Sequence, residues 1–343
     1  MSNLTNRLGK KPIIIAEVGQ NHQGSLKIAK QYIKEFAFRG ADIIKFQSRN
    51  NKELFSKDAY EKNYNSENSF GKTYGEHREK LELSFSELKI LKKECNKYKL
   101  KFMITPFDEK SLELISKVGV DIIKIASFDL GNLPFIDLIA KKKKVVAIST
   151  GGGNLIEIKK SVELLQKRKI KVILLHCVSE YPCPYNNLGL ENITLYKKKF
   201  PKCIIGSSDH FNGILSGPVA YLQGARVFEK HVTLNRGWKG TDHSFALEPE
   251  GFGRFVRDIH RTGMMLPTKK KNDIGKEPVF TKLGKSLIAN KLIKKGKKIK
   301  INDLSGKIFQ ENIVLVRYSH KIIGKKVKKN ILKGTPISFS DII

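Results

Sequence analysis

The chain has 343 residues, 40% of them hydrophobic, and a formal net charge of +32. The hydrophobic fraction suffices for a core, but no apolar run approaches the ~20 residues needed to span a bilayer, so we expect no membrane association. The lysines are scattered along the chain and are not interleaved with aromatic residues, so we expect no nucleic-acid partner; a basic surface would attract an anionic substrate instead.

Eight short apolar runs follow one another along the chain, and most are separated by stretches with helical spacing. Continuous apolar strands that alternate with helices predict a parallel sheet buried on both faces. About eight such units in roughly 250 residues predict an α/β fold of the (β/α)₈ TIM-barrel type, with its site at the C-terminal ends of the strands. The runs are 12–22, 41–47, 101–107, 121–127, 145–150, 172–177, 203–210 and 226–231.

Composition predicts two domains and a linker. Residues 1–267 form the barrel, after a loose lead-in over residues 1–11; residues 268–280 form a polar linker, and residues 281–343 form a small β-rich domain. Two long polar segments, 48–80 and 232–250, follow the second and eighth strands, so we expect both to cover the top of the barrel as binding loops.

Two histidines, His210 and His231, lie at the ends of the last two predicted strands. Neighbouring parallel strands place such residues side by side, and imidazole is a common ligand of divalent metals. Each histidine has an acidic neighbour, Asp209 and Glu229 respectively. The alternative interpretation is that both are hydrogen-bonded loop residues.

A second set of strand-end residues is basic and hydroxylic, and a glycine-rich turn, STGGGN, follows one of them. Backbone amides of such a turn and nearby hydroxyl groups suit an anion. A buried lysine needs an anionic partner; alternatives are a Schiff-base lysine or a structural ion pair with Glu17. The set comprises Lys45, Thr105, Lys124, Ser127 and Ser149. Tyr181, in a proline-rich loop, is a candidate contact for substrate or a packing residue.

Nine motifs in order resemble the sialic acid synthase family, which includes N-acetylneuraminate synthases. They are AEVGQNHQGS, IIKFQ, MITPFD, IKIASFD, ISTGGGN, LLHCVSEYPCP, IGSSDH, EKHVTL and GTDHSFALEPEGF, all within residues 12–255. Residues 281–343 resemble the family's C-terminal SAF (antifreeze-like, β-clip) domain. The resemblance implies a transferase that condenses phosphoenolpyruvate with an N-acetylated amino sugar, such as N-acetylmannosamine or a 6-deoxy-diamino analogue, to a nine-carbon 2-keto acid and phosphate, with C–O cleavage.

The resemblance also implies roles for individual residues. His210 and His231 would bind Mn²⁺ or Mg²⁺, which polarises the sugar aldehyde. Glu17 would stabilise a cation or handle a proton, with Glu229 and Asp242 as alternative acid–base groups. Tyr181 and Gln47 would face the sugar or phosphoenolpyruvate. The ligands of phosphoenolpyruvate would be Lys45, Thr105, Lys124, Ser127, Ser149 and Ser208.

The resemblance is incomplete in the C-terminal domain. The family usually has an Arg-Pro-Gly-x-Gly-Ile loop whose arginine reaches the sugar's N-acetyl group in the partner's barrel, within a domain-swapped homodimer. Here the stretch is ENIVLVRYSHKIIGKK, in which Arg317 is the candidate sugar contact, but the proline and both glycines are missing. The identity of the amino sugar therefore stays open.

Several alternatives remain at this stage. A related synthase for legionaminic or pseudaminic acid, or for a seven- or eight-carbon keto acid, would use the same chemistry. A Schiff-base aldolase would use Lys124, and a catalytically lapsed protein would only bind sugar. The four cysteines show no CxxC spacing and the first residues lack the apolar stretch of a signal peptide, so we expect a reduced, cytoplasmic protein.

Overall fold

The computed structural model describes residues 11–267 and 275–343. Most of the expected lead-in, residues 1–10, and residues 268–274 of the expected linker lie outside the described residues. The chain divides into two compact units, Met1–Leu266 and Pro267–Ile343. No helix in the described ranges is long and apolar enough to cross a membrane.

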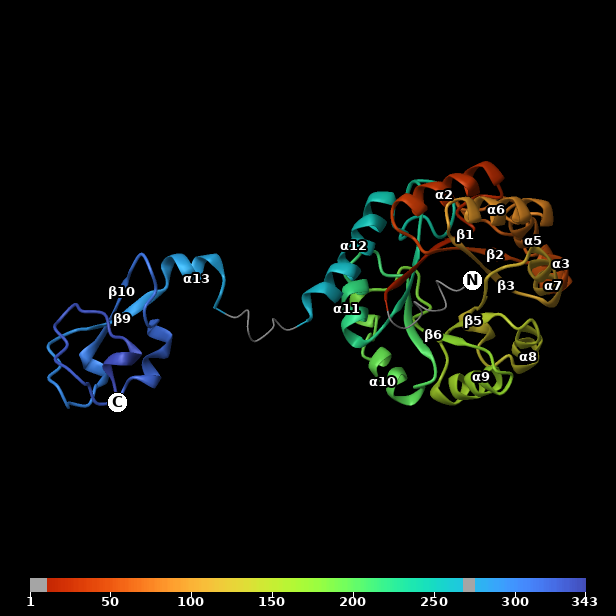
Figure 1. Cartoon of the computed structure of the whole chain (residues 1–343). Coiled ribbons are helices and arrows are strands. Elements are labelled where there is room, and N and C mark those ends of the chain that lie inside the picture. The colour runs from red at the N-terminus through yellow and green to blue at the C-terminus, as the bar shows by residue number, and fades with distance from the viewer. Residues whose placement is uncertain (1–10, 268–274) are drawn as a thin grey trace. The chain divides into compact units, whose positions relative to one another are not determined.

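Eight parallel strands close into a barrel in the first unit, so the predicted fold is confirmed (Figure 1). Each strand pairs with the next along the chain, and the first pairs with the eighth. The strands are β1 (Ile13–Gly19), β2 (Ile43–Ser48), β3 (Lys101–Pro106), β4 (Ile122–Ile125), β5 (Val145–Ser149), β6 (Val172–Cys177), β7 (Ile204–Asp209) and β8 (Val227–His231).

Helices follow the strands and surround the barrel (Figure 1). Local sequence fixes where they begin: Ser84 and Glu87 form a reciprocal capping box at the start of α6, and Asp108 caps α7. Gly119, with φ of +82°, ends α7 in the left-handed conformation that glycine adopts without strain. The main helices are α2 (Leu26–Phe38), α6 (Phe85–Lys97), α7 (Glu109–Val118), α8 (Leu133–Lys141), α9 (Leu155–Lys167), α10 (Asn192–Lys199), α11 (Ser216–Gln223) and α12 (Pro249–Met265).

Side-chain alternation along the strands divides the barrel into an inside and an outside. One buried cluster, including Ile13, Ile43 and Val227, fills the lower interior of the barrel. A second and larger cluster, including Ile14 and Ile44, packs between strands and helices. On each strand, the next inward-pointing residue after this interior cluster lies toward the C-terminal end of the barrel. Most of these positions are polar.

The long segment after β2 is more ordered than its weak periodicity predicted. It contains three short helices, α3 (Asn51–Leu54), α4 (Lys57–Glu61) and α5 (Tyr74–Glu79). Aromatic contacts tie it together, as between Tyr64 and Tyr74 and between Tyr64 and His77. Short elements held by side-chain packing leave little helical or strand periodicity in the sequence.

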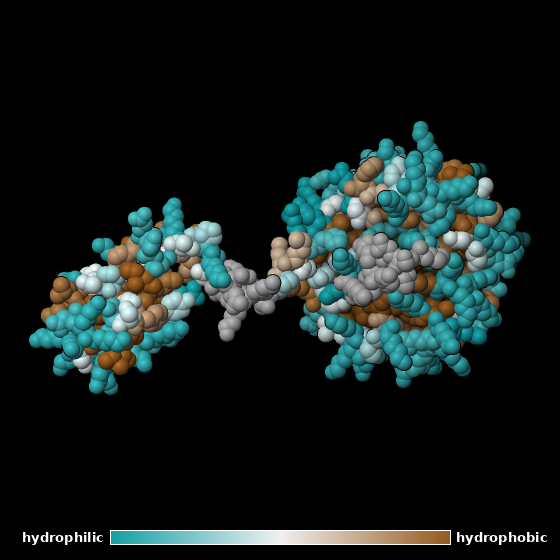
Figure 2. Space-filling model, in the orientation of Figure 1, coloured by the Kyte–Doolittle hydropathy of each residue, from teal (hydrophilic) through white to brown (hydrophobic). Residues whose placement is uncertain are grey.

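The second unit is small and has its own apolar core, which includes Leu287, Ile293, Ile331 and Ile337. Two antiparallel strands and several isolated bridges give it a β-rich character, as expected. Its elements are α13 (Pro278–Leu283), β9 (Lys285–Ala289), β10 (Leu304–Ile308) and the 3₁₀ turns η4 (Ile301–Asp303), η5 (Val316–Lys321) and η6 (Phe339–Asp341). Hydrophilic residues cover much of the visible surface of both units (Figure 2).

Candidate active site

A cavity of about 570 Å³ opens at the C-terminal ends of the barrel strands, a volume that suits small-molecule substrates. Strands and the loops that follow them supply its walls, as expected for this fold. Every predicted site residue of the first unit lines it: Glu17, Lys45, Gln47, Thr105, Lys124, Ser127, Ser149, Tyr181, Ser208, His210, Glu229, His231 and Asp242.

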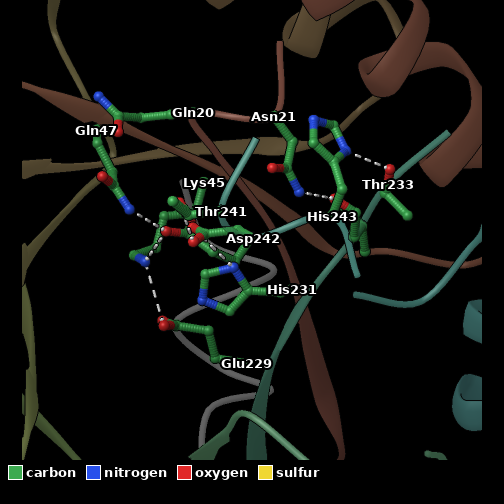
Figure 3. A network of polar contacts seen from close by, with 12 residues as sticks. Gln20, Asn21, Lys45, Gln47, Glu229, His231, Thr233, Thr241, Asp242 and His243 are labelled. Atoms are coloured by element: carbon green, nitrogen blue, oxygen red, sulfur yellow. Dashed lines mark hydrogen bonds and ion pairs between the residues drawn. The ribbon is translucent and has the colours of Figure 1, made fainter. Parts of the chain in front are cut away.

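Lys45 lies on the floor of the cavity between two carboxylates. Its Nζ is 2.8 Å from Oε1 of Glu17 and 3.1 Å from Oε1 of Glu229, and all three side chains are buried. The strand register explains the meeting, because Glu17 pairs with Lys45 across β1 and β2. Figure 3 shows Lys45 directed at Glu229. The structural lysine–Glu17 pair considered from the sequence is thus present.

Lys124 is the second buried lysine, and its charge is less well satisfied. Its Nζ is 3.9 Å from Oε1 of Glu229, beyond hydrogen-bond distance. Burial, and to a smaller extent the positive charge of Lys45, lower the pKa of Lys124 although Glu229 opposes the shift. Ser149 lies on the neighbouring strand β5, two residues after Ala147, which pairs with Lys124. Its hydroxyl group is buried and has no hydrogen-bond partner in the described chain. These donors are available to an anion.

Glu229 is held in its ionised form. Burial alone would raise its pKa, but Lys124 and Lys45, with a 2.9 Å hydrogen bond from the Ser208 hydroxyl, lower it to about 2. Such a carboxylate stabilises the lysine pair and is a poor proton donor near neutral pH.

Only one of the two carboxylate oxygens of Glu17 is hydrogen-bonded within the described residues. Oε1 accepts hydrogen bonds from Lys45 and, at 2.9 Å, from Nε2 of Gln47. Oε2 is buried and has no hydrogen-bond partner among the described residues. A carboxylate oxygen in this position can accept a proton or face a developing positive charge.

His210 and His231 lie side by side, with ring centroids 5.2 Å apart. Nδ1 of His210 is 2.7 Å from the carbonyl oxygen of Val178, so this nitrogen donates and Nε2 keeps its lone pair. Burial and the neighbouring His231 lower the pKa of His210 to about 4, which keeps the ring neutral at pH 7. Tyr181 covers His210, with ring centroids 3.8 Å apart.

The two imidazoles fit a divalent cation whose other ligands are water or substrate oxygens. His231 Nδ1 is buried, lacks a hydrogen bond, and lies 3.6 Å from Oδ2 of Asp242. The described part of the chain contains no cluster of three or more His, Cys, Asp or Glu side chains arranged to hold a metal. Open coordination positions are typical of catalytic rather than structural sites.

Strand residues next to the two histidines point in the opposite direction, to the outside of the barrel. Lys230 is 1% exposed and its ammonium group contacts Asp209, its register partner on β7, and the carbonyl oxygen of Phe211. The ammonium group thus contacts the residues on both sides of His210. His176 also points outward, and its Nε2 lies 2.7 Å from the carbonyl oxygen of Leu188.

Two arginines line the same cavity and were not predicted from the sequence. Arg49 continues the inward alternation of Lys45 and Gln47 past the end of β2, which was the available signal. Arg78 comes from α5 in the long segment after β2, where no periodicity pointed to it. Other lining residues that the sequence did not indicate are Gln20, Asn68, Phe107, Ala126, Phe128, Cys177 and Thr241.

Arg317, the remaining candidate, belongs to the second unit. It lies in η5, with its guanidinium 5.5 Å from the ring centroid of Phe280 and 5.6 Å from that of Tyr318.

Comparison with known proteins adds independent information. The model of the NeuB family matches residues 32–271. The chain is 34% identical to N-acetylneuraminate-9-phosphate synthase of Homo sapiens over 321 residues, which cover 93% of this chain and 89% of the relative. It is 36% identical to N,N'-diacetyllegionaminic acid synthase of Campylobacter jejuni over 326 residues, covering 94% and 97%.

A solved structure has the same architecture. It is an N-acetylneuraminic acid synthetase from Leptospira borgpetersenii serovar Hardjo-bovis in complex with citrate, with a TM-score of 0.68 and 33% identity. The alignment covers 77% of this chain and 87% of that one.

Proposed function

This chain belongs to the NeuB family, and we propose that its cavity binds phosphoenolpyruvate on the two buried lysines and joins it to an amino sugar. The resemblance drawn from the nine motifs is thereby confirmed, and the enzyme is a phosphoenolpyruvate-dependent synthase of the sialic acid type. The products are a nine-carbon 2-keto acid and phosphate. The roles of single residues below are our proposal.

The observation that carries the binding proposal is the unsatisfied donor set around Lys124. Its ammonium group has only a distant carboxylate, and the neighbouring Ser149 hydroxyl has no partner in the described chain. A buried ammonium group is stabilised by an anion that can accept its hydrogen bonds. Phosphate and carboxylate groups of phosphoenolpyruvate meet this need, with Lys45, Thr105, Ser127 and Ser208 as further ligands.

The bond-forming step joins C3 of phosphoenolpyruvate to the aldehyde carbon of the sugar. Water then adds to the oxocarbenium carbon C2, and phosphate leaves with the bridging oxygen, so the C–O bond breaks. We propose that the free Oε2 of Glu17 stabilises the cation or takes the proton of the water. Glu229, whose pKa is held at about 2, keeps the lysines charged, and Asp242 is the alternative acid–base group.

His210 and His231 would hold a divalent cation, Mn²⁺ or Mg²⁺. When bound, the ion supplies Lewis-acid polarisation of the aldehyde oxygen. The hydrogen bond from His210 Nδ1 to the carbonyl oxygen of Val178 orients the ring, so that Nε2 would be the atom that holds the ion. Tyr181 and Gln47 would contact the sugar.

The second unit and the cellular setting are also proposals. We assign residues 281–343 to the SAF type of domain and expect a domain-swapped homodimer in which Arg317 reaches the partner's sugar. All four cysteines are free thiols, which suits a reducing cytoplasm.

The test is phosphate release from phosphoenolpyruvate with a panel of N-acyl amino sugars, Mn²⁺, and a parallel series in EDTA. We expect sugar-dependent release that EDTA abolishes and Mn²⁺ restores. Release without any sugar would contradict the condensation, and full activity in EDTA would contradict the role of the two histidines. Trapping with borohydride should leave Lys124 unmodified; a trapped adduct would favour a Schiff-base aldolase.

A further inference from the structure

Two guanidinium groups lie on the cavity wall apart from the lysine and hydroxyl cluster. Arg49 follows β2, and Arg78 lies in α5. Lys45 and Lys124 are buried whereas both arginines are half-buried, so the arginines lie nearer to the solvent. Four residues at strand rise separate Lys45 from Arg49, about 13 Å between Cα atoms.

The negative charge around these arginines is sparse. Glu82 accepts from the backbone N–H of Arg49 at 2.9 Å and lies 3.5 Å from its Nη1. Arg78 forms no ion pair within the described ranges: it donates to Gln20 Oε1 and, at 2.6 Å, to the hydroxyl of Tyr74. Its Nε is buried and has no hydrogen-bond partner in the described chain.

The two guanidinium groups influence each other. Burial is the main cause that lowers the pKa of Arg49 to about 10; Glu82 opposes the shift, and the positive charge of Arg78 adds to it. Only Arg49 of these two half-buried cations has an ion-paired carboxylate, Glu82, so a further anion bound between them would stabilise both.

The arginine nearer to the reacting groups is held in place. Its guanidinium stacks 3.7 Å from the ring centroid of Phe107 and donates to Gln47 Oε1 at 2.6 Å. Gln47 in turn donates to Glu17. A chain of hydrogen bonds thus runs from Glu17 through Gln47 to Arg49, and Arg78 lines the same cavity. A sugar whose aldehyde lies near Glu17 would extend its far end toward the two arginines.

We propose that Arg49 and Arg78 form a second anion subsite, which binds a phosphate group at the end of the amino sugar remote from its aldehyde. The guanidinium fork suits a phosphate monoester in bidentate geometry. The enzyme therefore prefers a phosphorylated amino sugar to the neutral one. This inference rests on the proposed condensation and deepens it by naming the substrate class.

The experiment compares N-acetylmannosamine with its 6-phosphate in the full-length enzyme at saturating phosphoenolpyruvate. Arg78→Gln is the variant of choice, because removal of Arg49 would leave Glu82 without its ion pair. Arg254→Gln is the matched control: this exposed arginine on α12 pairs with Glu250 and does not line the cavity. Circular dichroism and thermal melting verify that both variants fold.

We expect wild type and Arg254→Gln to prefer the phosphorylated sugar in kcat/KM. In Arg78→Gln this preference should fall about 10- to 100-fold, the range for hydrogen bonds to a charged group. The loss should appear in the KM of the phosphorylated sugar, and Arg78→Lys should restore part of it.

Three results would overturn the subsite. One is equal use of both sugars by wild type, and another is an unchanged preference in Arg78→Gln. The third comes from a separate titration of phosphoenolpyruvate at saturating sugar: an increase in the KM of phosphoenolpyruvate alone in Arg78→Gln would assign the arginines to that substrate's phosphate. If neither sugar releases phosphate, the proposed condensation fails by itself. Calorimetric binding of the sugar 6-phosphate to wild type and Arg78→Gln then tests the subsite separately: weaker binding supports it and equal binding refutes it.

Discussion

Replacing Glu229 by glutamine should destabilise the barrel through its charge alone. Glutamine keeps the shape of the side chain and a hydrogen-bond acceptor, but it leaves Lys45 and Lys124 with one buried carboxylate fewer. The lysines lower the pKa of Glu229 from its ordinary value of 4.5 to about 2. A difference of this size corresponds to about 3 kcal/mol of unfolding free energy at pH 7.

The sign of the pH dependence follows from the same shift. A carboxylate with a lowered pKa in the folded state stabilises the protein above its unfolded pKa and loses this contribution as the pH falls toward the folded value. The difference between wild type and Glu229→Gln should therefore stay constant from pH 7 down to about 5 and shrink below 4.5.

Urea unfolding followed by tryptophan fluorescence is the assay, because Trp238, the only tryptophan, belongs to the barrel unit. Glu163→Gln is the control: Glu163 and Lys159 form an exposed pair on α9 with a 3.7 Å separation. A loss in Glu229→Gln no larger than the ~1 kcal/mol typical of exposed pairs would show that Glu229 does not stabilise the buried lysines.

Three further substitutions test the ion pair behind the cavity, the role of Glu17 and the packing of β7 against β8. Lys230→Met breaks the buried pair with Asp209 and should cost about 3–5 kcal/mol by the same unfolding assay, whereas wild-type stability would deny the pair any role. Glu17→Gln should bind both substrates in calorimetry yet lose most turnover; unchanged activity would remove Glu17 from the mechanism. Gly206→Ala would place a methyl group 2.4 Å from the carbonyl oxygen of Val227, so we expect a loss of about 1–3 kcal/mol, and an unchanged melting temperature would contradict it.

The barrel could be predicted because its strands are buried on both faces and so appear as continuous apolar runs. Inward positions such as Lys45 and Lys124 interrupt these apolar runs with charge, which marked the cavity. The sequence left open which partner satisfies each lysine. Strand register decides that question, since Glu17 lies opposite Lys45 whereas Lys124 lies opposite Ala147.

The arginines were harder to predict for a physical reason. Arg49 lies one residue past β2, where alternation is no longer enforced by strand pairing. Arg78 reaches the cavity from α5, whose position depends on aromatic packing within the segment rather than on periodicity. Asp209 and Lys230 would have been false positives by the same signal. Both are charged residues near the ends of their strands, yet side-chain alternation points them to the outside of the barrel, away from the cavity.

In the proposed reaction, phosphoenolpyruvate loses phosphate by C–O cleavage during condensation with an amino sugar. The most direct measurement uses phosphoenolpyruvate with ¹⁸O in the bridging C–O–P position, and mass spectrometry of the phosphate that is released. We expect that phosphate forms only when amino sugar is present and that it carries the bridging ¹⁸O. Unlabelled phosphate, which requires P–O cleavage, or labelled phosphate formed without sugar would contradict it.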